Sequence, residues 1–225
     1  NFHLERPVER DMYEYITKDN IWLNNMKKTP ELKNLVFENI LSESLKFNPP
    51  TEDSYIKTYP EFIQFFKNIS NISKHDLVIS SHFVYGWMPT IIELKFQDME
   101  VVLNSLNKAK NGAMLTVGEL ELLKNTINNS LVGLSKLLHF INPIDYAIWD
   151  SRIYRYTTDK KSSYGIGNTQ LYLNYLSKLN EIESHVDFDE IKKNVSVHFD
   201  YEISSKRVIE LLMFEADKRD NKKLI

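Results

Sequence analysis

The residues whose types could do chemistry together are Lys136 and Asp150. Gly133 permits a tight turn, and a short apolar helix that carries Lys136 near its start follows it. A loop containing Pro143 comes next, and Asp150 stands where another helix begins. A lysine amine becomes a nucleophile once burial or a neighbouring cation lowers its pKa, and a carboxylate can stabilise positive charge or help to move protons. The segment therefore offers an amine and an acid group on either side of one loop.

Both residues also have purely structural interpretations. Asp150 and Ser151 can cap the helix that contains Ile153 and Tyr154, because the positive end of a helix favours a carboxylate. Lys136 can be an ordinary lysine at the solvent edge of an apolar helix. The residue types alone leave these alternatives open.

The order of these features resembles the helix-hairpin-helix DNA glycosylases, in particular the lysine-bearing branch typified by the 8-oxoguanine DNA glycosylases. The resemblance implies an all-α fold with a helix-hairpin-helix core. It also implies that Val132, Gly133 and Leu134 form the hairpin whose backbone N–H groups bind a DNA phosphate. In the same family pattern Lys136 is the nucleophile and Asp150 the catalytic carboxylate.

The resemblance implies an enzyme that excises a damaged or modified base from double-stranded DNA, with or without AP-lyase activity. A neutral Lys136 amine would attack the sugar C1′ and form a Schiff base, while Asp150 would stabilise positive charge on the sugar as the base departs. The DNA would be bent and the target nucleotide flipped out of the helix. No cofactor and no metal are implied.

Four basic residues after Asp150 are candidates for contact with the DNA backbone. They are Arg152, Arg155, Lys160 and Lys161, and Lys206 with Arg207 form a second basic stretch. The formal net charge of −3 and the pI near 6.1 argue against a protein that coats nucleic acid, although a local basic face is compatible with them. Ordinary solvated charges are the alternative interpretation.

A second motif, Tyr85-Gly86-Trp87-Met88-Pro89-Thr90, places aromatic rings beside a turn and a helix start. Tyr85 and Trp87 are candidates for the wall of a base pocket or a wedge in DNA, with an aromatic core cluster as the alternative. His139 follows Lys136 by about one helical turn and is a third candidate near the pocket, in a core or supporting role. Neither His139 nor His82 has a partner at metal-ligand spacing, so we expect no metal site.

The composition predicts a helical protein, because 6 glycines and 7 prolines are too few for the frequent turns of a sandwich or barrel. Apolar spacing, prolines and capping residues predict where the helices lie. We expect helices over 31–47, from Pro60 to Ile69, over 89–96, over 97–110, from the capping box of Thr116 and Glu119 to about Asn128, after Asn168 or Thr169, and after Ser204 or Ser205.

We expect residues 1–225 to form a single domain, with two intimate helical subdomains over about 1–112 and 113–217 and a cleft between them as a variant of this organisation. The chain has no cysteine, which excludes disulfides, thiolate zinc sites, iron–sulfur clusters and cysteine nucleophiles. The sequence contains no run of about 18 apolar residues that could span a membrane, and its N-terminus lacks the apolar stretch of a signal peptide. A cytoplasmic or nucleoid location is therefore expected, and the DNA glycosylase hypothesis has the protein acting as a monomer.

Two other functions remain open from the sequence. The first is a non-catalytic helical module that binds DNA or a protein on a glycosylase-like scaffold, with phage defence as one setting. The acidic pI favours this alternative. The second is a helical interaction module that has no connection with DNA.

Overall fold

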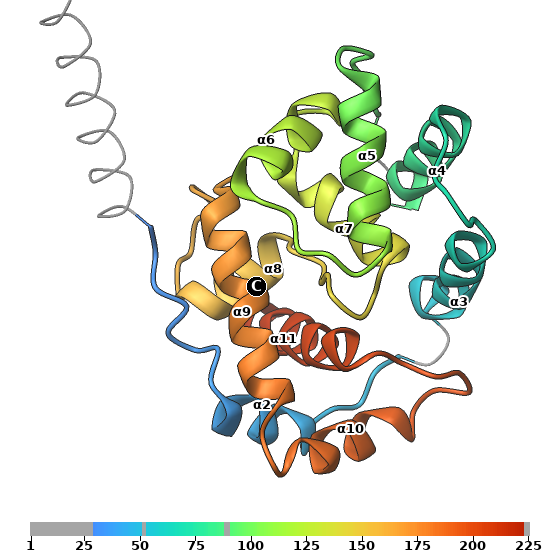
Figure 1. Ribbon diagram of the computed structural model, residues 1–225. Helices are drawn as coiled ribbons and strands as arrows, with labels where there is room; N and C mark the ends of the chain where they lie inside the picture. The colour runs from blue at the N-terminus through green and yellow to red at the C-terminus, as the bar shows by residue number, and fades with distance from the viewer. Residues whose placement is uncertain (1–28, 51–52, 88–90, 223–225) are drawn as a thin grey trace, which may run out of the picture. The chain divides into compact units, whose positions relative to one another are not determined.

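A computed structural model of the protein describes residues 29–50, 53–87 and 91–222 (Figure 1). Over these residues the chain forms ten α-helices and no strand, which confirms the predicted all-α class. None of the described helices has the length and apolar character needed to cross a bilayer. The helices are α2 (Phe37–Ser44), α3 (Ser54–Lys67), α4 (Lys74–Trp87), α5 (Met99–Lys110), α6 (Val117–Thr126), α7 (Leu131–Ile141), α8 (Ser151–Thr158), α9 (Thr169–Glu183), α10 (Phe188–Ser196) and α11 (Ser205–Lys222).

The chain divides into two compact units, Asn1–Glu31 and Leu32–Ile225, and all ten helices belong to the second. Within that unit α5 packs against α6 and α7, so the chain on both sides of Gly112 shares one body. The helices fall into two groups, in which α3 to α6 surround α7, and α2, α8, α9 and α10 surround α11. The segment between α7 and α8 passes from the first group to the second (Figure 1).

Helix α7 is buried on almost every side, as expected for a helix that is apolar around its circumference. Ser130 caps it, because the Ser130 side chain accepts a hydrogen bond from the Gly133 N–H group. Among the residues of α7, Val132 and Lys136 alone are part-exposed, and they lie one turn apart. The helix therefore presents a single narrow stripe away from the core, and Lys136 lies on it.

Two predicted helices differ from the structure. The helix expected over 31–47 begins at Phe37, because the chain before it bonds to the end of α8 instead. There the Asn34 side chain donates to the Tyr156 carbonyl and the Asn34 N–H group to the Thr157 carbonyl. The helix expected over 89–96 is absent over 91–96, where Leu94 pairs with Ile127 in an isolated β-bridge. Residues 89–90 lie outside the described part of the chain.

The predicted capping residues are confirmed at the starts of α6, α9 and α11. Thr116 and Glu119 form a reciprocal capping box at α6, and the Asn168 side chain caps α9. Ser204 accepts a hydrogen bond from the Arg207 N–H group at the start of α11. Local side-chain to backbone bonds thus fix these helix starts without help from distant residues.

Pro60 lies inside α3, where the sequence predicted that it would sit in the first turn. A proline has no N–H group, so the carbonyl of Ile56, four residues earlier, loses its helical partner. The Tyr201 hydroxyl donates to this carbonyl at 3.1 Å. A side chain that precedes α11 therefore repairs the gap in α3 and joins the two groups of helices.

Gly133 of α7 lies directly against the Tyr85 side chain of α4. A Cβ atom at this position would overlap the ring and hydroxyl of Tyr85, a fully buried residue of α4. The Tyr85 hydroxyl is also held by the Ile127 carbonyl at 3.5 Å. Glycine is therefore required here for close packing of two helices.

We expect Gly133→Ala to destabilise the protein by about 1–3 kcal/mol, because the added methyl group overpacks a core that cannot expand. The free energy of unfolding from urea titration measures this loss. Combining Gly133→Ala with Tyr85→Leu removes the ring that the methyl group would meet, so the double variant should lose less than the sum of the two single losses. Additive losses would contradict this packing role for Gly133.

Candidate active site

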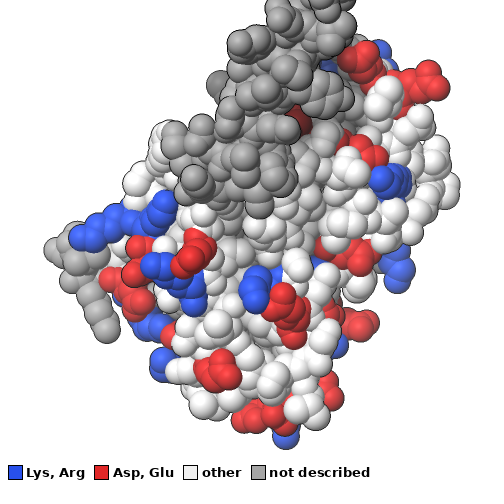
Figure 2. Space-filling view, turned by 60° about the vertical axis from the view of Figure 1, so that its left-hand side comes forward, with Lys and Arg blue, Asp and Glu red and all other residues white. Residues whose placement is uncertain are grey.

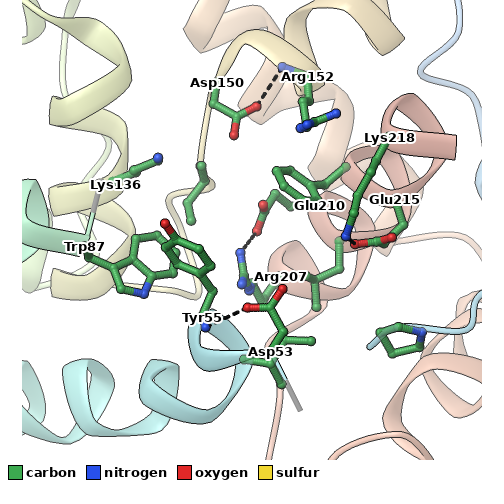
Figure 3. Close-up of a pocket in the computed structure, with 15 residues that line it drawn as sticks. Asp53, Tyr55, Trp87, Lys136, Asp150, Arg152, Arg207, Glu210, Glu215 and Lys218 are labelled. Carbon is green, nitrogen blue, oxygen red and sulfur yellow. Dashed lines mark hydrogen bonds and ion pairs between the residues drawn. The ribbon is translucent and has the colours of Figure 1, made fainter. Parts of the chain in front are cut away.

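A cavity of about 420 Å³ opens between the two groups of helices (Figure 3). Its volume is in the range of small-molecule binding sites. Of the residues predicted from sequence, the cavity brings together Trp87 of α4, Lys136 of α7, and Asp150 and Arg152 at the start of α8. Acidic and basic side chains balance in its lining, which contains Asp53, Asp150, Glu210, Glu215, Lys136, Arg152, Arg207 and Lys218.

The Lys136 ammonium points into the cavity toward Asp150 (Figure 3). Burial lowers the pKa of Lys136, and the Arg207 guanidinium acts in the same direction, while the Asp150 and Glu210 carboxylates oppose the shift. Among the described residues Lys136 forms no ion pair or hydrogen bond, and its ammonium lies over the Trp87 ring, 5.5 Å from Nζ to the centroid. The amine is thus kept near acid groups without being tied to one.

The Asp150 carboxylate has two functions in the structure. Its Oδ1 atom accepts hydrogen bonds from the N–H groups of Arg152 at 2.9 Å and Ile153 at 3.1 Å, which caps α8. The predicted capping role is therefore confirmed. The same side chain lines the cavity, where its negative charge partly opposes the lowering of the Lys136 pKa by burial. Capping fixes the carboxylate in place through Oδ1, and Oδ2 has no hydrogen bond among the described residues.

The residues that precede Asp150, from Tyr146 to Trp149, are buried and belong to no helix or strand. Each of their four carbonyls bonds to a side chain from another element. The donors are His139 to Tyr146, Tyr172 to Ala147, Tyr175 to Ile148 and Ser135 to Trp149. We call this set the carbonyl clamp. It satisfies buried backbone groups that would otherwise be costly, and it fixes the chain that carries Asp150.

Ser135 connects the clamp to the candidate nucleophile. Its hydroxyl oxygen accepts a hydrogen bond from the Trp149 N–H group at 2.9 Å and lies 3.2 Å from the Trp149 carbonyl. Its single hydrogen is shared between that carbonyl and the Val132 carbonyl at 2.9 Å. Ser135 precedes Lys136 and Trp149 precedes Asp150, so one side chain links the two chain segments that carry the candidate catalytic residues.

His139 belongs to the core and does not line the cavity. Its Nδ1 atom faces the Tyr146 carbonyl at 2.8 Å, so we assign the ring proton there, and Nε2 then accepts from the Tyr59 hydroxyl at 2.8 Å. Burial lowers the pKa of His139 to about 3, with a further contribution from Arg207. The ring is therefore neutral near pH 7, and Tyr85 is likewise a core residue rather than a cavity wall.

Arg207 and Glu210 form a buried ion pair on α11 that the sequence analysis missed. Burial raises the pKa of Glu210, and the Arg207 guanidinium opposes that shift. The guanidinium carbon of Arg207 also lies 4.6 Å from the centroid of the Tyr59 ring. Both charged residues line the cavity, so α11 supplies a cation and an anion opposite Lys136. The available sequence signal was two opposite charges three residues apart beside the apolar residues Val208 to Phe214.

The predicted hairpin is part of a helix. Val132, Gly133 and Leu134 lie in the first turn of α7. The Ser130 Oγ atom accepts a hydrogen bond from the Gly133 N–H group at 3.2 Å, and the Ser130 carbonyl accepts one from the Leu134 N–H group at 3.0 Å. Two of the three amides expected to bind a DNA phosphate therefore have partners within the protein. The expected turn centred on Gly133 is replaced by a capped helix start.

The basic residues after Asp150 divide into two pairs. Arg152 and Arg155 both bond to the buried Asp217 carboxylate of α11, at 3.2 Å for Arg152 and 2.6 Å for the closer Arg155 contact. Lys160 and Lys161 are exposed in the loop after α8 and do not line the cavity. On the face drawn in Figure 2 acidic and basic side chains are interspersed rather than gathered into a basic band. The two arginines therefore hold α8 against α11.

Within the described residues no group of three or more His, Asp or Glu side chains is arranged to hold a metal ion. A scan against protein-family models and searches of curated proteins and of solved structures found no match to this chain. Functional inference therefore rests on the geometry of the cavity.

Replacing Asp150 with Asn should lower the pKa of Lys136 further, because it removes a negative charge that favours the protonated amine. Asparagine caps helices about as well as aspartate, so the fold should persist. An NMR titration of side-chain-labelled lysine follows the Lys136 resonance directly. Glu215→Gln is the control, since Glu215 lines the same cavity but does not contribute to the Lys136 shift. A Lys136 pKa that is unchanged in Asp150→Asn would show that the two groups do not interact.

The buried neutral His139 should make the protein less stable in acid. The pKa of His139 is 6.5 in the unfolded chain and about 3 in the folded protein. Between these two pH values His139 binds a proton in the unfolded chain and none in the native protein. The contribution of His139 to the free energy of unfolding is therefore complete above pH 6.5. It decreases as the pH is lowered toward 3, by up to about 1.4 kcal/mol per pH unit. His139→Asn keeps a donor for the Tyr146 carbonyl and removes the titrating ring. Urea unfolding at several pH values should give a shallower decline for this variant, whereas an equal decline would refute the assignment.

Proposed function

We propose that the protein is a DNA glycosylase that excises a damaged or modified base through the Lys136 amine, with Asp150 assisting. The observation that supports this proposal best is that the Lys136 ammonium and the Asp150 carboxylate line one cavity of about 420 Å³. Separation of the two groups onto different surfaces would have removed the chemical basis of the proposal. Double-stranded DNA is the proposed substrate.

The environment of Lys136 favours the neutral amine that nucleophilic attack requires. Burial lowers its pKa, and no carboxylate bonds to it directly, so the proton is released more readily than from a surface lysine. In the proposed reaction Nζ attacks the sugar C1′, the bond to the base breaks with its electrons leaving on the base, and Nζ loses a proton. Opening of the sugar ring then gives a Schiff base.

Asp150 is suited to stabilise the positive charge that develops on the sugar during this step. Its position does not depend on substrate, because two helix N–H groups hold Oδ1 and the carbonyl clamp fixes the preceding residues. Preorganised charge of this kind needs no rearrangement during the reaction and contributes strongly to catalysis. Trp87 supplies an aromatic wall for a flipped nucleotide.

A second candidate is a non-catalytic binding module on the same scaffold. Two observations favour it: the Lys136 ammonium lies over the Trp87 ring, a contact that stabilises the protonated form, and the amides of Gly133 and Leu134 are occupied by Ser130. Such a module would bind DNA or a protein without forming a covalent intermediate. The two candidates differ in whether Lys136 ever reacts.

Sodium borohydride should trap a covalent adduct between the wild-type protein and a duplex that contains an abasic site, because it reduces the Schiff base. Lys136→Gln should form no adduct. Lys178→Gln is the matched control, since Lys178 is an exposed lysine of α9 outside the cavity, and it should form as much adduct as the wild type. Asp150→Asn should slow base release from a reactive lesion duplex by about 100-fold or more, although its amine is less protonated.

Denaturing gel electrophoresis measures both the adduct and the released base. Equal trapping by wild type and Lys136→Gln would rule out Lys136 as the nucleophile. Saturable duplex binding that is unchanged in Lys136→Gln and Asp150→Asn, with no adduct and no base release over a lesion panel, would support the binding module instead.

A further inference from the structure

The proposed reaction releases a proton from Lys136 that needs an acceptor. When Nζ bonds to a carbon atom the nitrogen becomes positively charged, and it must lose a proton before a Schiff base forms. Asp150 is poorly suited to take that proton, because protonation would remove the negative charge that stabilises the sugar. A second acid group in the same cavity would allow each carboxylate to keep one function.

Glu210 of α11 is a second acid group in this cavity. It lines the cavity together with Lys136 and Asp150, and Figure 3 shows its carboxylate pointing into the cavity. The Oε2 atom accepts a hydrogen bond from Arg207 Nη1. The Oε1 atom has no hydrogen bond among the described residues. One oxygen therefore holds the carboxylate in place and the other is free to accept a proton.

The free oxygen of Glu210 is in reach of the cavity, although the side chain is only 3% exposed. Over the described part of the chain, the side-chain polar atoms that are fully buried without a hydrogen bond are Ser81 Oγ, Trp87 Nε1 and Arg207 Nε. Glu210 Oε1 is not among them, so it keeps some accessible surface, and the cavity is a surface that Glu210 lines. A water molecule in the cavity can therefore bond to Oε1.

The electrostatic environment brings the proton affinities of the amine and the acid group closer together. Burial raises the pKa of Glu210, Arg207 opposes that shift, and Asp150 adds to it. Burial lowers the pKa of Lys136, and the Glu210 carboxylate is one of the charges that oppose this shift. Transfer of a proton from Lys136 to Glu210 is therefore less unfavourable than between a surface lysine and a surface glutamate.

Glu210 interacts with charged and titratable groups from each of the helices around it. These groups are Tyr59 of α3, Lys136 of α7, Asp150 at the start of α8, Tyr175 of α9 and Arg207 of α11. Burial raises the pKa of both tyrosines, so they stay neutral, and Arg207 stays charged. Lys136 and Asp150 are therefore the neighbours whose change of charge acts on Glu210.

We propose that Glu210 accepts the proton that Lys136 Nζ loses as it bonds to the sugar carbon, through one water molecule in the cavity. The Nζ lone pair forms the bond to C1′, and the electrons of the breaking bond leave on the base. One Nζ proton passes to the water, and a proton of that water passes to Glu210 Oε1, which becomes a neutral acid. Arg207 is a positioning residue, because it holds Oε2. The inference rests on the proposed function, since it adds a second acid group to the same reaction.

Labelling of Lys136 by propionaldehyde and sodium cyanoborohydride tests this acceptor without DNA. Nζ bonds to the aldehyde carbon, the carbonyl electrons move to oxygen, and the same Nζ proton must leave before cyanoborohydride reduces the imine. Peptide mass spectrometry of the full-length protein measures the rate at Lys136. Glu210→Gln should label about 100-fold more slowly at neutral pH. Without a proton-accepting role it would label faster, because loss of the Glu210 charge lowers the pKa of Lys136.

The pH dependence of labelling distinguishes a proton acceptor from a structural charge. The ratio of the wild-type rate to the Glu210→Gln rate should rise with pH while Glu210 ionises and then level off, because only the carboxylate accepts a proton. Arg207→Gln removes a charge that lowers the pKa of Glu210, so its rise should occur at higher pH. Glu181→Gln is the control, since Glu181 is an exposed residue of α9 outside the cavity, and it should label like the wild type.

A double variant separates loss of the acceptor from loss of stability. Glu210→Gln leaves the Arg207 charge buried without its carboxylate, which is destabilising. Arg207→Gln combined with Glu210→Gln removes both charges together, so it should remain folded by circular dichroism and label as slowly as Glu210→Gln.

The outcomes separate the acceptor from the proposed reaction on DNA. Equal or faster labelling in Glu210→Gln and in the double variant, a rate ratio that does not change with pH, or no labelling of wild-type Lys136 would overturn the role of Glu210 even if borohydride traps a DNA adduct. Slower labelling with the expected rise in the ratio would support it even if no DNA adduct forms, in which case the proposed function alone fails.

Discussion

Four consecutive carbonyls, from Tyr146 to Trp149, lie in the core where neither a helix nor a sheet can satisfy them. The side chains of Ser135, His139, Tyr172 and Tyr175 bond to them, and burial raises the pKa of both tyrosine hydroxyls, so these remain protonated donors. Unpaired buried carbonyls would be costly, so the extended conformation depends on all four donors. The position of Asp150, the next residue, is a consequence of this clamp.

The carbonyl clamp also connects the segment that carries Asp150 to the helix that carries Lys136. Ser135 and His139 belong to α7, the helix that carries Lys136, so the segment before Asp150 is bonded directly to the support of the proposed nucleophile. Helix α11 closes the opposite side with the Arg207 and Glu210 pair, and Asp217 holds α8 through two arginines. Burial of Lys136 among these elements lowers its pKa, while the facing carboxylates limit the shift. The contacts that bury Lys136 in the core therefore also set the direction of its pKa shift.

Local signals in the sequence predicted the features that depend on near neighbours, including the all-α class, the capping box at Thr116 and the cap at Asp150. Pairing of Lys136 with Asp150 in one cavity followed from family resemblance rather than from spacing. Helices α4 and α10 were missed. The helix predicted over residues 91–96 was wrong, because Leu94 pairs with the distant Ile127. The Arg207–Glu210 pair was missed because its relation to the cavity depends on how α11 packs. Tyr85 and His139 lie in the core for the same reason, since burial is decided by contacts between distant helices.

A crystal structure of the wild-type protein reduced with borohydride on a duplex that contains an abasic site would test the central claim most directly. The predicted result is a covalent bond from Lys136 Nζ to the sugar carbon, with the Asp150 carboxylate beside that sugar and the Ser135 hydroxyl still bonded to the Trp149 backbone. Attachment of the sugar to any other amine, or an Asp150 side chain turned away from the bound sugar, would contradict it.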